Sequence, residues 1–171
     1  MTLKIFALKT VKNLGIVKEA IALTPAISVL ATGAILSAPT ASASLAVSPD
    51  TLPLSVVGTA GGRVAIPQGI VPAGQGRPQK SCLGFASLEA NHRLDLNTVP
   101  SSLTITVNSF SSDVDTTLAV KTPEGQWLCG DDISATNTDA AVTISSPSAG
   151  SYEVWVGTFD GGYADYELSL N

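Results

Sequence analysis

The sequence predicts an all-β fold, a small antiparallel β-sandwich, and three observations lead to this prediction. Short segments alternate apolar and polar residues, as half-buried strands do. Acidic, glycine-bearing turns such as Thr122-Pro123-Glu124-Gly125 separate these segments. No helical periodicity follows the first 43 residues.

The alternation places seven strands at intervals of roughly ten residues. They are expected at 92–96, 103–107, 118–120, 127–129, 142–144, 152–156 and 166–170. In the sixth, Tyr152, Val154 and Val156 share one face, and Glu153 and Trp155 share the other. Seven half-buried strands close most simply as two sheets packed face to face. The predicted core comprises Leu94, Leu96, Leu103, Ile105, Val107, Leu118, Val120, Trp127, Val142, Ile144, Tyr152, Val154, Val156, Leu168 and Leu170.

The chain of 171 residues divides into three parts. Residues 1–43 have the features of a secretory signal peptide: four early lysines, an apolar run over 20–36, and Ala41-Ser42-Ala43 before the cleavage point. The alternative is an uncleaved anchor helix, but Pro25 interrupts the apolar run, so no stable membrane span is expected after processing. Residues 44–80 contain five prolines and six glycines and are expected to form an N-terminal arm or linker. The alternation allows two short strands within it, at 54–57 and 63–66. Residues 81–171 are the predicted β-sandwich domain.

The predicted mature chain is acidic, with five basic and thirteen acidic residues after position 43 and a net charge of −8. This field repels phosphate backbones, so nucleic acid is not an expected partner. It attracts cations. The predicted location is secreted or periplasmic, and two cysteines in an exported chain predict one disulfide, Cys82–Cys129. The alternative is two buried free thiols.

Two acidic pairs are the candidate metal ligands. Asp113 and Asp115 precede one predicted strand, and Asp131 and Asp132 end the next. If the two strands form a hairpin, the pairs lie near the same end, where hard carboxylate oxygens suit calcium. Asp139, in the following loop, is a further candidate. The other interpretation stays open, in which these aspartates cap turns.

The lone His92 and the aromatic residues offer weaker signals. The sequence contains no Gly-x-Ser-x-Gly nucleophile elbow whose serine His92 could activate, so a structural role is expected for His92. Trp155, Phe159 and Tyr163 form a candidate platform for a sugar or peptide ligand. The alternative is that Trp155 belongs to a second core layer or to a covered edge, and this alternative is favoured over the platform.

Three motifs resemble the bacterial pre-peptidase C-terminal domain family. They are Asp115-Thr116-Thr117-Leu118, the run from Gly125 to Asp132, and the run from Gly150 to Gly157. Cys82 with Gly84, and His92 ahead of an alternating strand, also look like the opening of that family. The resemblance implies a β-sandwich of jelly-roll type that is not itself catalytic, accompanies secreted hydrolases, and in some members binds calcium. Ala90-Asn91-His92 departs from the family, whose members often carry proline and aspartate before the histidine.

These observations together predict a secreted, non-catalytic binding or stability module assisted by calcium. Its expected partner is an extracytoplasmic protein or a polysaccharide. The alternative is a small secreted hydrolase or protease inhibitor that acts through loop residues, for which His92 or two facing carboxylates in a pocket would be the sign.

Overall fold

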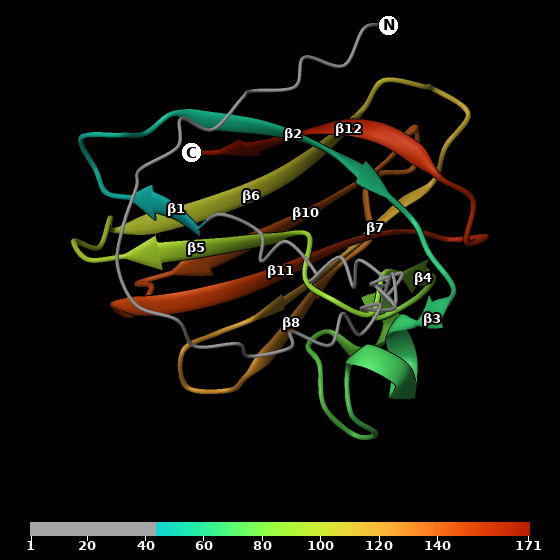
Figure 1. The fold of residues 1–171 in the computed structure, drawn as a ribbon, viewed down its shortest axis with the longest axis horizontal. Coiled ribbons are helices and arrows are strands. Elements are labelled where there is room, and N and C mark those ends of the chain that lie inside the picture. The colour runs from blue at the N-terminus through green and yellow to red at the C-terminus, as the bar shows by residue number, and fades with distance from the viewer. Residues whose placement is uncertain (1–43) are drawn as a thin grey trace, which may run out of the picture. The chain divides into compact units, whose positions relative to one another are not determined.

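The computed structural model describes residues 44–171, which form two β-sheets packed face to face (Figure 1). The expected signal peptide, 1–43, lies outside the described residues. The strands and short turns are β1 (Ser44–Val47), β2 (Leu54–Ala60), β3 (Val64–Ala65), η1 (Ile66–Ile70), η2 (Gln79–Ser81), β4 (Phe85–Ala86), β5 (His92–Leu96), β6 (Ser102–Ser109), β7 (Thr116–Lys121), β8 (Trp127–Gly130), β9 (Asp132–Ser134), β10 (Asn137–Ser145), β11 (Gly150–Thr158) and β12 (Ala164–Leu170). The predicted all-β sandwich is confirmed.

One sheet has five strands in the order β2-β12-β6-β10-β9, and the other has seven strands built around β11. β5 and then β4 pair with one edge of β11, and β7 pairs with the opposite edge. β8 continues from β7, β3 pairs with β4, and β1 runs parallel to β5. All other strand pairs are antiparallel.

The main core lies between the sheets and has the predicted register. Tyr152, Val154 and Val156 are buried in it, while Glu153 remains partly exposed. Of the fifteen core residues predicted above, Ile144 is half-buried and the others are buried. Tyr166 is completely buried as well, although the prediction placed it on a strand without naming it as core.

The expected arm or linker at 44–80 is instead part of the sandwich, which corrects the prediction. β1 and β2 each add a strand to a sheet, and the suggested short strand at 54–57 extends to Ala60. Ile66 and Val71 then cover the outer face of the seven-stranded sheet. Proline and glycine are frequent here because the chain turns repeatedly between short elements, not because it is detached from the fold.

Candidate functional site

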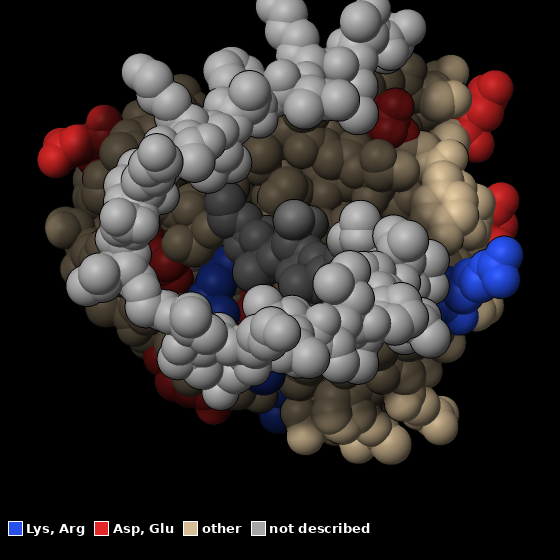
Figure 2. Space-filling view, in the orientation of Figure 1, with Lys and Arg blue, Asp and Glu red and all other residues tan. Residues whose placement is uncertain are grey.

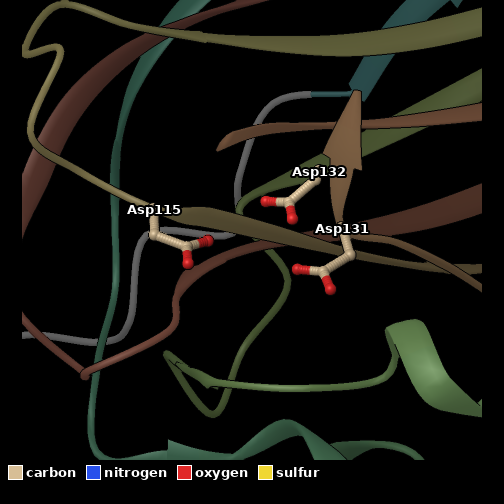
Figure 3. A group of neighbouring side chains, drawn as sticks. All are labelled: Asp115, Asp131 and Asp132. Carbon is tan, nitrogen blue, oxygen red and sulfur yellow. The ribbon is translucent and has the colours of Figure 1, made fainter. Parts of the chain in front are cut away.

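The β7–β8 hairpin brings three aspartates together at one end of the sandwich. Leu118 pairs with Gly130, so Asp115, just before β7, lies across from Asp131 and Asp132, which follow β8. Each of the three offers one carboxylate oxygen, and these atoms all lie within 4.8 Å of one another. Figure 3 shows the three carboxylates pointing toward a common space. We refer to Asp115, Asp131 and Asp132 as the acidic cluster.

Two further predicted ligands lie outside the acidic cluster. Asp113 is exposed, and its carboxylate accepts a hydrogen bond from its neighbour Ser112 at 3.5 Å. Asp139 accepts hydrogen bonds from the Ser109 backbone N–H at 3.1 Å and from Thr116 Oγ1 at 3.4 Å. Asp139 lies in β10, not in a loop, and its carboxylate links β10 to residues of β6 and β7. The structure brings three of the four predicted carboxylates together and leaves Asp113 aside.

The acidic cluster is electrostatically strained. The pKa of Asp115 is raised above its usual value. Burial of the carboxylate is the largest cause, and repulsion from Asp132, Asp131 and Asp160 adds to it. The pKa of Asp131 is also raised, mainly by burial of its carboxylate and to a lesser extent by repulsion from Asp132. Asp115 Oδ1 is buried and has no hydrogen-bond partner among the described residues. A buried carboxylate oxygen without a partner is costly, so this end of the sandwich carries an uncompensated penalty.

The predicted disulfide between Cys82 and Cys129 is confirmed, with the two Cα atoms 5.1 Å apart. It joins the segment before β4 to strand β8. Both cysteines are buried with Trp127 and Trp155 in a second core on the outer face of the seven-stranded sheet. The disulfide therefore fixes the 66–82 segment over that face.

The candidate ligand platform does not form as a set. Trp155 is only 7% exposed, its ring centroid lies 5.0 Å from that of Trp127, and its Nε1–H donates to the Leu88 carbonyl at 3.2 Å. Phe159 and Tyr163 are 53% and 70% exposed. The second core layer, which was the favoured alternative, is the observed arrangement, because Trp155 has the 66–82 segment above it and not solvent.

His92 has a structural environment. Its Nε2 is hydrogen-bonded to the Tyr166 hydroxyl at 2.7 Å, and the two rings meet edge to face. This contact links β5 of one sheet to β12 of the other. Burial lowers the pKa of His92, so the neutral imidazole is favoured in the folded protein.

The sequence interpretation missed the role of Asn91, the residue before His92. Along this edge of β11, the pairing with β5 ends at Val154 and the pairing with β4 is at Thr158, so Val156 lies in a gap between the two partner strands. Asn91 Oδ1 accepts from the Val156 N–H at 2.8 Å, and Asn91 Nδ2 donates to the Thr59 carbonyl at 3.0 Å. The available signal was the departure of this segment from the family pattern.

Three comparisons with known proteins give one similar solved structure. No protein-family model matches the chain, and no curated protein matches it. Among solved structures, the chain is similar to the pre-peptidase C-terminal domain of a collagenase from Bacillus anthracis, with 15% sequence identity and a TM-score of 0.43. The match covers 77% of this chain and 97% of that domain. Among the described residues, no helix is long and apolar enough to cross a membrane.

Proposed function

We propose that this chain is a non-catalytic β-sandwich module that works outside the cytoplasm and is stabilised by calcium at the acidic cluster. Its role is to bind or stabilise an exported protein or a polysaccharide. The observation that carries the proposal is the convergence of the Asp115, Asp131 and Asp132 carboxylates, with Asp115 Oδ1 buried and without a hydrogen-bond partner in the part of the chain that the structure describes.

The residues of the acidic cluster fit calcium rather than a softer metal. All three are carboxylates, and calcium prefers several hard oxygen ligands. Among the described residues, the cluster contains no histidine or cysteine, the ligands that zinc and copper favour. A bound divalent cation would supply the positive charge that offsets the repulsion raising the pKa values of Asp115 and Asp131.

The extracytoplasmic location is supported by the disulfide. Disulfides persist in oxidising compartments and are rare in the cytosol. In this chain both cysteines are used in one buried bond. Extracellular calcium is also abundant enough to occupy a site of modest affinity.

The non-catalytic assignment is supported by the environment of His92. Catalysis by a Ser-His-Asp arrangement needs a histidine that reaches a nucleophile. Here the Nε2 of His92 is engaged with the Tyr166 hydroxyl inside the sandwich, and burial raises the pKa of Tyr166 far above its usual value. The pair therefore connects two strands and is poorly suited to exchange protons near neutral pH.

Thermal melting with and without calcium tests the proposal. Binding to the folded state alone stabilises by mass action, so melting in calcium at about 100 times its Kd is expected to occur roughly 10 °C higher than in chelator. Asp115→Asn is expected to remove most of this increase. Asp113→Asn, two residues away and outside the acidic cluster, is the matched control and is expected to keep it.

Magnesium in place of calcium checks selectivity, because magnesium demands a tighter octahedral shell and releases its water reluctantly. We expect a smaller increase with magnesium. A wild-type melting curve that does not move in millimolar calcium would contradict the metal site, and an equal loss in Asp113→Asn and Asp115→Asn would contradict its location.

A further inference from the structure

Strand β2 forms an open edge of the five-stranded sheet (Figure 1). Among residues 44–171, it pairs with β12 on one side and with no strand on the other. Its seven residues, LSVVGTA, contain no charge and no proline. Natural proteins usually protect edges of this length with charges, prolines or bulges, because an open edge offers its backbone to another chain.

The hydrogen bonds between β12 and β6 show which residues of β12 face β2, and so which backbone groups of β2 point away from the sheet. Asn171 and Thr104 exchange both of their backbone hydrogen bonds, and the Phe110 N–H donates to the Asp165 carbonyl. Residues of an antiparallel strand alternate in the side to which their N–H and C=O point. The odd-numbered residues of β12 therefore bond to β6, and the even-numbered residues bond to β2.

The even-numbered residues of β12 pair with even-numbered residues of β2, so the backbone N–H and C=O groups of those β2 residues point toward β12. The groups of the odd-numbered residues Ser55, Val57 and Thr59 point the other way, away from the sheet. The Thr59 carbonyl already accepts from Asn91 Nδ2. The N–H and C=O groups of Ser55 and Val57 remain on the open edge. The side chains of both residues are also exposed, that of Val57 at 65%.

The other edges of the described sheets are shorter or covered. β9 has three residues and begins with Asp132. β8 is covered by Arg77, whose N–H donates to the Trp127 carbonyl and whose carbonyl accepts from the Cys129 N–H. β1 has four residues. Among the described strands, β2 is thus the long uncharged edge that stays open.

Residues of opposite charge flank β2 at similar separations along the sequence from its central residue, Val56. Asp50 precedes Val56 by six residues, and Arg63 follows it by seven. Both are exposed. The ion pairs among the described residues are Arg93–Asp95 and Lys121–Glu153, so Asp50 and Arg63 have no ion-pair partner there.

We propose that β2 binds a second copy of this chain, antiparallel and edge to edge, with Val56 on the two-fold axis. Ser55 then lies opposite the partner's Val57, and the four outward backbone groups of each copy meet the same groups of the other. In an isologous arrangement the Asp50 end of each copy faces the Arg63 end of the other, so the flanking charges are of opposite sign at both ends. Two copies of an acidic chain meet with least repulsion along an uncharged strand.

A ladder this short gives a dimer that depends on concentration, because small interfaces are weak. Sedimentation of the purified protein from micromolar to millimolar concentration is expected to show a reversible shift from monomer to dimer. Val57→Lys is expected to leave only monomer, because it places like charges beside the axis. Phe110→Lys is the matched control, since Phe110 is also 65% exposed but lies off this edge, and it is expected to dimerise normally.

Charge reversal tests the register independently of the strand itself. Asp50→Arg and Arg63→Asp are each expected to raise the dimer dissociation constant several-fold, and the double variant is expected to restore it. Monomer alone at millimolar concentration, or a dimer that survives Val57→Lys, would overturn the proposal. A double variant no better than either single reversal would overturn the antiparallel register.

Discussion

At the scale of single residues, Asn91 shows how one side chain completes a ladder that the strands leave open. Its carbonyl oxygen caps the Val156 N–H, and the Val156 carbonyl accepts instead from the Gly61 N–H. Its amide nitrogen reaches Thr59 on the other sheet. The position needs one acceptor and one donor on the same side chain, which asparagine provides and aspartate does not.

Asn91→Asp is therefore expected to destabilise the protein by about 1–3 kcal/mol, because the Thr59 carbonyl loses its donor and faces a carboxylate instead. Denaturant unfolding measures this free energy. Asn97→Asp adds the same charge at an exposed position after β5 and is the control. Equal effects from the two variants would assign the loss to net charge and not to the bridge between the sheets.

At the scale of elements, the β7–β8 hairpin was predictable and its surroundings were not. Alternation and the turn at 122–125 predicted the hairpin and placed Asp115 beside Asp131 and Asp132. The pattern could not separate Asp113 from this group, because the i, i+2 rule holds only in extended backbone and Asp113 lies before β7 begins. Likewise, alternation put Trp155 opposite Val154 but could not show which segment covers that face.

Substitution in the hairpin should have opposite effects in the presence and absence of calcium. The folded-state pKa of Asp131 is raised above 3.8, so its ionisation costs stability as the pH rises through that pKa, and the cost is fully present at neutral pH. In chelator at neutral pH, Asp131→Asn is expected to melt above the wild type. The difference should shrink below pH 3.8, where the wild-type carboxyl is protonated in both states.

In saturating calcium the order should reverse, because the wild type gains a ligand-linked stabilisation that Asp131→Asn largely loses. Melting curves of both proteins in the two buffers check the prediction. A variant that melts below the wild type in chelator would mean that Asp131 makes a favourable contact when ionised, and that the acidic cluster is not strained.

At the scale of the whole molecule, residues 44–80 belong to the fold although their composition suggested a linker. Val47, Ile66 and Val71 are each no more than 2% exposed. Burying a side chain of this kind stabilises by about 1.5–3 kcal/mol relative to leaving it exposed, so residues 44–80 contribute to both cores of the sandwich. Composition failed here because proline and glycine report local turns, whereas burial depends on strands far away in the sequence.

A chain beginning at Ser81 is therefore expected not to fold cooperatively, whereas one beginning at Ser44 is. Without β2, the even-numbered residues of β12 lose their backbone partners, and without Ile66 and Val71 the tryptophans of the second core meet water. Thermal melting followed by near-ultraviolet circular dichroism tests both chains, because Trp127 and Trp155 report the packing. A cooperative transition with a native tryptophan signal in the shorter chain would show that 81–171 is an independent domain and that β1 and β2 only line it.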